Sequence, residues 1–512
     1  MNSETKAIGI DLGTTNSLVS IIEKGKSKII PNNVGDFLTR SCAYLKGDEL
    51  IVGRAALNER QFDPENFVDS SKRHMGKVDS DGNSLPVLSD YTPEQIAAAI
   101  LEYLKSCAED YLGESVSDVV ITVPAKYPER AKRAVKWAAE RAGFAGIKLA
   151  PEPVAAKLAH DPKSDSPCKT AVFDFGGGTF DISIIDFDGT GKFSVLSISG
   201  DRDTGGEDID DAVLSYTVDQ AQKQGCPIDL ESNLQIAYEL KDRCRDAKET
   251  LSMSEETNIA VDNREKICKV GLSRDKLTEL AKPIIERIEK YCREALDEAN
   301  LSPDQIDMVL LAGGSSNNFF VPDIIRKIFA QEPRRDVEMD KVVAMGAAIY
   351  AAKKFGDDHT PLEVAGKTLL PSQLAVTNIC PTDLCIAAMK GDDQREYNSV
   401  LIPSGSVLPY SKSFKFTPSH RSASVVNVKL YDGGANDLSE NHTPLKSAQL
   451  SVQPVETEQK NANRINVTVS MSDEGLVEIT AVDTLLNKPV DIELQLGTCT
   501  RDGFSSLSKP AS

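Results

Sequence analysis

Two segments of the chain each place an aspartate before a glycine-rich turn, and these residue types suit the binding of phosphate. The segments are residues 8–21 and 172–184. Glycines let backbone N–H groups approach an anion closely, and hydroxyl groups add further donors. A carboxylate beside each turn would repel phosphate unless a divalent cation lay between them. When the two copies are aligned on their aspartates, Asp11 corresponds to Asp174, Gly13 to Gly176 and Thr15 to Gly178.

The repetition predicts two facing lobes that clamp a metal-bound nucleotide. Each copy has an apolar strand, then the turn, then a second alternating strand, which is the pattern of a β-hairpin. The alternative is a chance pair of glycine turns without a ligand. Because both turns also carry an aspartate at the same place, the sequence favours the nucleotide site.

Alternating strands and helices over residues 6–355 predict an α/β domain that would position these turns. Residues 92–112 are a clear helix, since Thr92 can cap it and Pro93 fits its first turn. Gly346 interrupts an alanine-rich helix, which predicts close packing there on backbone or ligand. Further predicted elements are strands over residues 118–124 and 308–312 and helices over 128–142, 234–251, 274–299 and 340–354.

The composition changes after residue 354. Residues 356–373 are polar and contain glycine and proline, which predicts an interdomain linker. Residues 374–499 have short β-like segments separated by turn clusters, which is typical of an antiparallel sandwich. Residues 500–512 are serine-rich and predicted to be disordered. The predicted strands include residues 424–430, 464–469, 476–482 and 490–496.

The bulk composition limits the class of protein. A chain of 512 residues is too long for one core. The net charge of −20 argues against binding of nucleic acid, whose phosphates it would repel. No apolar run is long enough for a membrane span, and the polar start is not typical of a secretory signal. The ten cysteines include no Cys-x-x-Cys pair, so we expect reduced thiols in a cytoplasmic protein without membrane partners.

Four further segments, residues 71–76, 152–156, 205–210 and 311–316, occur between and after the two turns. In order and spacing, the whole set resembles the 70-kDa heat-shock protein chaperones, through about residue 496. The resemblance implies an α/β actin-like two-lobed ATPase domain over residues 1–355, with ATP or ADP and Mg²⁺ in its cleft. It further implies an all-β sandwich domain over residues 374–499 that grips extended apolar segments of unfolded polypeptide clients. A J-domain co-chaperone and a nucleotide-exchange factor are the implied partners.

The resemblance also assigns roles to residues. Asp11 and Asp174 would hold Mg²⁺ through water. Lys72 is a movable point charge suited to the γ-phosphate and the attacking water, and Glu152 or Asp181 could orient or deprotonate that water. The implied catalytic set is Lys72, Glu152, Thr179 and Asp181. The implied nucleotide-binding set is Gly13, Thr14, Thr15, Gly176, Gly177, Gly178, Gly205, Gly206, Glu207, Lys248, Ser252, Gly313, Gly314, Ser315 and Asp340.

The chain departs from the family pattern at several positions. Asn317 stands where an arginine packs on the base, and Arg245 replaces an acidic residue and offers an alternative stacking group. Lys132 stands where the family has a relay arginine. Residues 366–371 are the nearest segment to the leucine-rich family linker, but they contain a proline and no flanking acids. These changes predict weaker base binding and altered coupling between the domains.

The β region carries the implied peptide site. Met389 belongs to a strand that resembles the one arching over bound peptide, and Ser424 is expected opposite it. Core packing in the sandwich is the alternative for either residue. The chain ends soon after residue 496, where family members usually continue into a helical lid, so the resemblance predicts faster peptide dissociation.

Three functions remain open from the sequence. The leading one is an ATP-dependent molecular chaperone that binds and releases apolar segments under control of hydrolysis. The second is a regulatory or co-chaperone member with weak or uncoupled ATPase activity, which the altered linker and base pocket favour. The third is an actin-fold sugar kinase, which the duplicated turns permit but the β-sandwich and residues 71–76 argue against.

Overall fold

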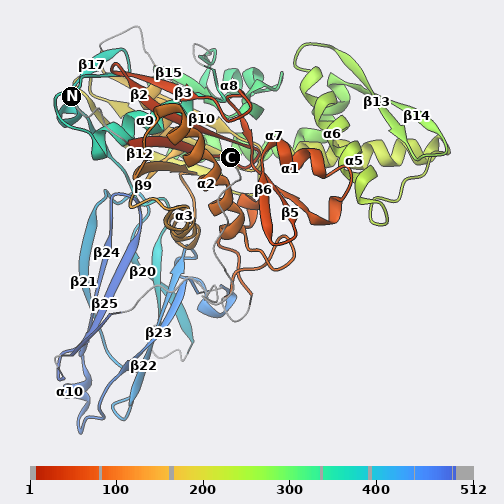
Figure 1. Ribbon diagram of the computed structural model, residues 1–512. Helices are drawn as coiled ribbons and strands as arrows, with labels where there is room; N and C mark the ends of the chain where they lie inside the picture. Colours follow the sequence, from red (N-terminus) through yellow and green to blue (C-terminus); the bar gives the residue numbers. More distant parts are fainter. Residues whose placement is uncertain are drawn as a thin grey trace.

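The computed structural model describes residues 7–79, 83–160, 166–334, 338–389, 395–442, 444–486 and 488–491 of the 512-residue chain. An α/β body forms the upper part of Figure 1, and a β-sandwich lies below it, next to helix α3 (Glu129–Arg141). A unit of helices and a two-stranded sheet extends from the body to the right. Within the described ranges, no helix is both long and apolar enough to cross a membrane.

The first sheet of the body is built around the first predicted hairpin. Strands β1 (Ala7–Leu12) and β2 (Asn16–Glu23) pair antiparallel, and β1 pairs in parallel with β8 (Asp118–Val123). With β3 (Lys26–Ile30) and β9 (Gly146–Pro151), the order is β3-β2-β1-β8-β9. The other elements are β4 (Thr39–Arg40), β5 (Cys42–Lys46), β6 (Glu49–Val52), α1 (Arg54–Glu59), η1 (Pro64–Asn66), β7 (Phe67–Asp69), η2 (Ser71–His74) and α2 (Pro93–Leu112).

The second sheet repeats the plan of the first around the second hairpin. Strands β10 (Cys168–Phe175) and β11 (Phe180–Phe187) pair antiparallel, and β10 pairs in parallel with β15 (Met308–Ala312). With β12 (Lys192–Asp201) and β18 (Ala375–Thr377), the order is β15-β10-β11-β12-β18. The other elements are α4 (Glu152–Ala159), α5 (Gly206–Lys223), α6 (Leu234–Thr250), β13 (Glu256–Asp262), β14 (Ile267–Ser273), α7 (Arg274–Glu298), η3 (Pro303–Gln305), η4 (Gly314–Asn317), α8 (Val321–Phe329) and α9 (Val342–Phe355).

The helices predicted for the body are confirmed, with small differences at their ends. At the start of α2, the Thr92 amide donates to Oε1 of Gln95 at 2.8 Å, and the helix ends at Gly113 with a φ of 69°. The close packing predicted at Gly346 is confirmed, because a Cβ there would lie 1.7 Å from the carbonyl oxygen of Ala155 in α4. Helices α4 and α9 share one buried core with strands of both sheets.

Part of the segment predicted as an interdomain linker is folded against the body. Strands β16 (Leu362–Val364) and β17 (Lys367–Leu369) form a hairpin, followed by η5 (Pro371–Gln373). Leu362 and Val364 are buried in the core that holds α4 and α9. The hairpin contacts turns at two places, since Glu363 N donates to Gly25 O at 2.8 Å and Lys367 Nζ donates to Gly189 O at 2.5 Å.

The connection also adds a strand to the second sheet. Residues 366–371 contain the end of the hairpin turn, β17 and the start of η5, and β18 then pairs in parallel with β12. The polar residues between the short strands made the whole segment resemble a linker in the sequence. Its few apolar side chains are nevertheless buried against the body. The domain boundaries at residues 355 and 373 remain predictions.

The sandwich consists of two four-stranded antiparallel sheets that share one buried core. Their orders are β20-β19-β22-β23 and β21-β24-β25-β26. The predicted strands over residues 424–430, 464–469 and 476–482 are confirmed as β22, β24 and β25. Residues 492–496 of the fourth predicted strand, and the tail 500–512, lie outside the described residues. The elements are β19 (Leu384–Met389), β20 (Glu396–Ile402), β21 (Tyr410–Phe416), β22 (Val425–Asp432), η6 (Ser439–Asn441), β23 (Lys446–Ser451), α10 (Glu458–Asn461), β24 (Ile465–Met471), β25 (Val477–Asp483) and β26 (Lys488–Asp491).

Candidate functional site

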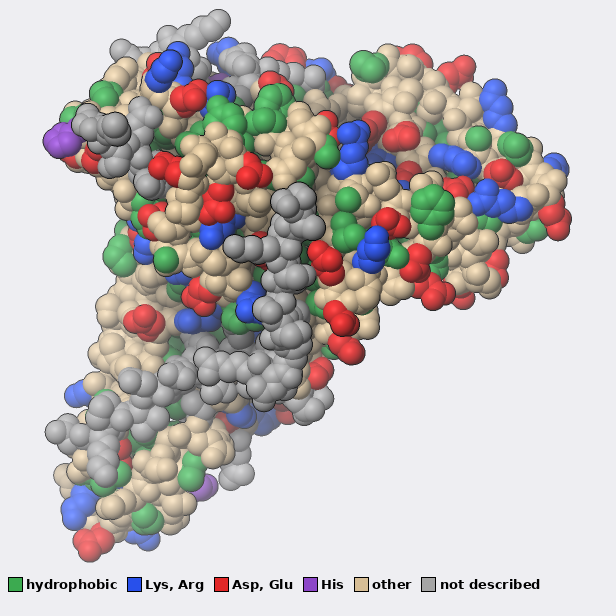
Figure 2. All heavy atoms as spheres, in the orientation of Figure 1, with side chains coloured by type: hydrophobic (Ala, Val, Ile, Leu, Met, Phe, Trp, Pro, Cys, Tyr) green, Lys and Arg blue, Asp and Glu red, His purple; other side chains and the backbone are tan. Residues whose placement is uncertain are grey.

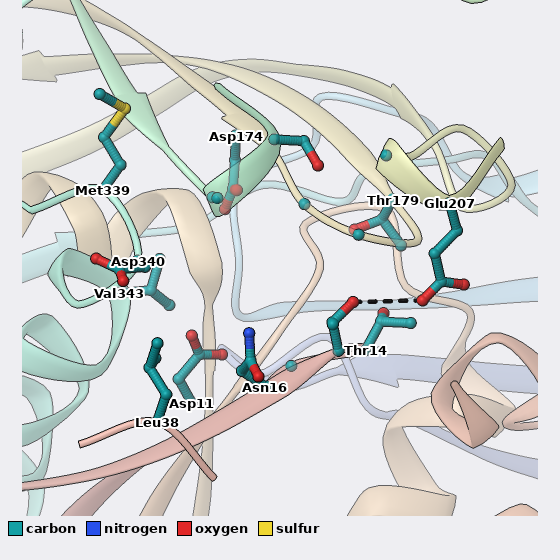
Figure 3. A pocket seen from close by; sticks show the side chains of 18 of the residues that line it. Asp11, Thr14, Asn16, Leu38, Asp174, Thr179, Glu207, Met339, Asp340 and Val343 are labelled. Atoms are coloured by element: carbon teal, nitrogen blue, oxygen red, sulfur yellow. Dashed lines mark hydrogen bonds between the residues drawn. The ribbon is translucent and has the colours of Figure 1, made fainter. Parts of the chain in front are cut away.

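The two glycine turns meet at one cavity of the α/β body. Figure 3 shows Asp11 and Thr14 on one side of this cavity and Asp174 and Thr179 on the other. Most of the residues predicted for the nucleotide site line it. Besides Asp11, Thr14, Asp174 and Thr179, the predicted residues that line the cavity are Gly13, Thr15, Lys72, Glu152, Gly176, Gly177, Gly206, Glu207, Lys248, Gly313, Gly314, Ser315 and Asp340.

The turns touch each other, and the contact leaves no room for side chains on the second turn. A Cβ on Gly177 would lie 2.1 Å from Thr15 Oγ1, and one on Gly178 would lie 2.8 Å from Thr14 Oγ1. The N-terminus of α5 is tied to the same turn, since Glu207 N donates to Gly177 O at 2.9 Å. Glycine is therefore required here for the close approach of the two turns, one from each sheet of the body.

Four predicted residues do not line the cavity. Gly178 is covered by Thr14, and Gly205 packs on the second turn, where a Cβ would lie 2.2 Å from Gly177 O. Asp181 lies on β11 directly opposite Asp174 and is buried. Ser252 follows α6, and its carbonyl oxygen accepts a hydrogen bond from Arg274 at 3.2 Å.

A buried ion pair lies at the floor of the cavity. Lys72 Nζ is 2.8 Å from Glu152 Oε1, and the two side chains are 7% and 9% exposed. Burial lowers the pKa of Lys72, but the charges of Glu152, Tyr127 and Asp11 outweigh this and hold the pKa above its usual value. Lys72 is therefore a fixed positive charge between the two turns.

Three aspartates gather around this ion pair. Burial, followed by the charge of Glu152, raises the pKa of Asp11 to about 7, although Thr122 donates a hydrogen bond to it at 3.0 Å. The same two causes raise the pKa of Asp181 to about 7. Burial also raises the pKa of Asp174, which faces both Glu152 and Asp181. The positive charge near these carboxyl groups is too small to offset the effect of burial on their pKa values.

The carboxylates fit a divalent cation. One oxygen of Asp174 and one of Asp181 are buried without a hydrogen-bond partner, and a cation would satisfy such oxygens. In the described part of the chain, no group of three or more acidic, His or Cys side chains forms a metal site by itself. Mg²⁺, however, is usually held by one or two carboxylates together with water and phosphate oxygens.

Glu207 connects the two halves of the body beside the cavity. Its Oε1 accepts hydrogen bonds from Ser70 at 2.5 Å and from Thr15 at 3.3 Å. Arg73 adds an ion pair to the next residue of α5, with Nη2 2.9 Å from both carboxylate oxygens of Asp208. The N-terminus of α5 is therefore held against the segment that carries Lys72.

A second bridge joins α1 to α6 next to Arg245 of the cavity lining, and sequence reasoning missed it. Arg60, at the end of α1, forms an ion pair with Asp242 of α6. Its guanidinium carbon lies 5.3 Å from the ring centre of Phe67 and 5.1 Å from that of Tyr238. The rings themselves pack edge to face at 5.4 Å. No local spacing links these residues, because they come from segments far apart in the chain.

Arg245 and Asn317 depart from the family pattern among the residues expected near the adenosine. Arg245 lines the cavity, but its guanidinium pairs with Asp210 and Asp242, each at 3.5 Å. Stacking of Arg245 on a base remains a prediction, since these ion pairs use the edge of the guanidinium and stacking would use its face. Asn317 is exposed and donates to Gly314 O at 3.1 Å. Lys248 Nζ lies 2.7 Å from Asp210, which also pairs with Arg245.

The two residues predicted to bind peptide are not brought together by strand pairing. Strand β19 pairs with β22 over Leu384–Ile386 and residues 430–432, the end of β22 away from Ser424. Ser424 precedes β22, and its carbonyl oxygen accepts from Val452 N at 2.9 Å. Met389 ends β19 and is 50% exposed. An adaptable side chain is thus available at the surface.

The sandwich contacts the body through a carboxylate that lies just before β25. The Glu474 side chain is 3% exposed and lies between two lysines of the body. Lys136 Nζ is 3.1 Å and Lys148 Nζ is 3.0 Å from its two oxygens, and Leu149 N donates to it at 3.4 Å. Further contacts are Arg130 with Leu445 O, Arg133 with Val477 O, Glu129 with Val477 N, Lys354 with Asp473 and Asn378 with Asp473 O.

Lys132, in place of the relay arginine, also belongs to this contact. It is buried, and a Cβ on Gly475 would lie 2.4 Å from its Nζ. Burial lowers the pKa of Lys132, which the charges of Asp432 and other groups partly offset. Beside this contact, α3 and the sandwich line an open cavity of about 760 Å³, whose lining includes Trp137, Tyr410 and Met471.

The geometry combines two facing phosphate-type turns, a buried Lys–Glu pair with three aspartates, and a sandwich attached through α3. In a comparison with known protein families, the chain matches the family model described as Hsp70 protein. The match covers residues 7–502 of the chain.

Proposed function

Because this chain belongs to the Hsp70 family, we propose that it is an ATP-dependent molecular chaperone that binds and releases apolar segments of unfolded proteins. The observation that carries the proposal is the buried Lys72–Glu152 pair, which lies between two aspartate-bearing turns. We further propose that it works in the cytoplasm with a J-domain co-chaperone and a nucleotide-exchange factor.

The proposed hydrolytic step uses the charges at the floor of the cavity. Lys72 would contact the γ-phosphate and the attacking water. Asp181 does not line the cavity but is a candidate to accept the proton through an intervening group, because one of its oxygens has no partner and its pKa is about 7. Glu152 is already paired with Lys72 and would orient that lysine. Asp11 and Asp174 would hold Mg²⁺, which would neutralise charge on the phosphates when bound.

The proposed nucleotide contacts outside this floor come from two glycine segments. The backbone at Gly13, Thr14 and Thr15 and at Gly176 and Gly177 would face the phosphates. Gly313, Gly314, Ser315, Lys248 and Asp340 would surround the adenosine. The absence of an arginine at Asn317 would leave the base less tightly held, by about 1 kcal/mol for one lost stacking contact.

Single-turnover ATP hydrolysis by the full chain tests the function. The preformed ATP complex is followed with and without an apolar peptide and a J-domain protein. A chaperone of this kind should hydrolyse ATP faster when both are present. Hydrolysis that neither addition changes would refute coupled chaperone activity and support the second candidate below.

The folded connection favours a second candidate, a nucleotide-binding regulatory or co-chaperone member. Residues 362–377 are packed on the body through β16, β17 and β18, so this segment has many contacts to break before the sandwich can separate. A strongly held connection would make hydrolysis insensitive to peptide. The same single-turnover experiment separates the two functions.

We expect Arg60→Ala to speed the release of bound ADP by about tenfold. Arg60 packs on two rings and joins α1 to α6 through Asp242, which also pairs with Arg245 of the cavity lining. Contacts of this kind contribute about 1–2 kcal/mol together. Stopped-flow release of a fluorescent ADP analogue measures the effect. Arg264→Ala is the matched control, because Arg264 pairs with Glu239 of the same helix but is 49% exposed. Equal rates in wild type and Arg60→Ala would contradict a role of this bridge in holding the nucleotide.

A further inference from the structure

Cys226 follows α5 and Cys268 lies on β14, in the unit formed by α5, α6, β13 and β14 at the right of Figure 1. Helix α5 ends in a turn in which Gly225 has a φ of 71° and Cys226 N donates to Ala221 O at 2.9 Å. This helix-ending turn folds the chain back, so that Cys226 packs under the helix end. Both cysteines belong to the same buried core.

Strand register places the second thiol beside the first. Cys268 lies directly opposite Val261 in the β13–β14 pair, and both are buried while their neighbours along the strands are more exposed. Cys226 Sγ lies 3.8 Å from Val261 O and 3.4 Å from Lys266 O. Its thiol therefore sits over the stretch of ladder that carries Cys268. After burial, hydrogen bonding between the two thiols is the next cause that raises the pKa of Cys226.

The loop that carries Cys226 is fastened to the hairpin on both sides. Lys266 Nζ donates to Gln224 O at 2.7 Å, and Gln224 Nε2 donates to Lys269 O at 3.2 Å. Beyond the cysteine, Asn263 Nδ2 donates to Pro227 O at 3.2 Å. These bonds hold the two sulfur atoms in position before any bond forms between them.

The pair is close to solvent although both thiols are buried. Residues 222–225 and 264–267 are exposed, so only a thin layer of chain covers the sulfur atoms. Figure 2 shows charged side chains gathered at the outer end of this unit. A small polar oxidant can reach such a position through local opening of the loop, which costs far less than global unfolding.

We propose that Cys226 and Cys268 form an oxidation site, which a small disulfide of the glutathione type converts into an intramolecular disulfide bond. One protein thiolate attacks the small disulfide and releases one small thiol, which leaves a mixed disulfide. The other protein thiolate then attacks the mixed disulfide and displaces the second small thiol. Two S–H bonds of the protein are lost and one S–S bond forms, and the two electrons reduce the small disulfide to two thiols.

The bond would close a loop around α6. That helix carries Asp242, which pairs with Arg60, and Lys248, which lines the cavity. Joining residues 226 and 268 removes disorder from the unfolded chain, so the oxidised protein should melt about 5 °C or more above the reduced protein. The site does not depend on the proposed ATPase, because its formation is read from the cysteines themselves.

The test treats the full chain with glutathione disulfide, blocks free thiols with an alkylating reagent and maps peptides without reduction. We expect one cross-linked peptide pair that joins residues 226 and 268, with a mass lower by two hydrogen atoms than the two reduced peptides. The rise in melting temperature should appear with the cross-link and vanish on reduction. Alkylation of both cysteines in the treated protein, or a cross-link between other cysteines, would overturn the proposal.

Matched variants separate the pair from other thiols. Cys226→Ser should lose the cross-link and the shift in melting temperature. Cys244→Ser should keep both, since Cys244 lies on α6 in the same unit and contacts Thr217 Oγ1 at 3.7 Å. The wild-type map decides the proposal even where a variant folds poorly. A shift in melting temperature that persists in Cys226→Ser would also count against it.

Discussion

Lys72→Met should slow single-turnover ATP hydrolysis by about 10²–10⁴-fold. The ammonium of Lys72 lies 2.8 Å from Glu152, and its charge lowers the pKa of Asp11 and Asp181 against the effect of burial. Without it, the carboxylates would repel both the γ-phosphate and the developing negative charge. Methionine keeps much of the side-chain volume, so the cavity should keep its shape. Phosphate release from a preformed ATP complex measures the effect.

The control for this prediction is Lys77→Met. Lys77 lies five positions further along the chain, is 40% exposed and is 3.8 Å from Asp203. This variant should hydrolyse ATP at the wild-type rate. Binding of ADP by Lys72→Met verifies that the fold is retained. If Lys72→Met binds ADP and hydrolyses ATP as fast as the wild type, Lys72 has no catalytic role.

Glu474→Lys should separate the sandwich from the body. Glu474 is almost fully buried between Lys136 and Lys148, and Lys132 lies next to the following glycine. Reversal of its charge would bring a fourth positive charge among three lysines. Loss of a buried charge pair at an interface costs about 2–5 kcal/mol. Small-angle X-ray scattering should therefore record a larger radius of gyration, and limited proteolysis should cut faster near residues 356–377.

Glu478→Lys is the matched control, because Glu478 lies on β25, four residues after Glu474, and lines the same cavity but is exposed. Its scattering profile should remain that of the wild type. Unchanged scattering for Glu474→Lys would show that the contact through α3 does not hold the domains together. Expansion in both variants would point to general charge repulsion instead of the specific Glu474 contact.

The sequence was most informative where local patterns determine structure. The hairpins around Asp11 and Asp174 could be predicted because strand alternation and a glycine turn are adjacent in the chain. Helix α2 could be predicted from Thr92 and its apolar spacing. The cavity residues followed from the family resemblance, and the structure brings most of them together. Their roles in catalysis remain proposals.

Contacts between distant segments could not be predicted. Strand β18 is three residues long, and its register is decided by β12, which lies far earlier in the chain. The hairpin of β16 and β17 is too short for a periodic signal, so its polar surroundings resembled a linker. Glu474 and Arg60 resemble ordinary surface charges in the sequence, since their partners are brought near only by the completed fold.

The position of Trp137 makes its intrinsic fluorescence a reporter of domain arrangement. It is the single tryptophan of the chain, and it lines the cavity between α3 and the sandwich. Movement of the sandwich away from α3 would expose the indole to water and shift its emission to longer wavelength. Ultraviolet excitation of the unlabelled protein can therefore follow domain separation in real time, whether nucleotide, peptide or oxidation drives it.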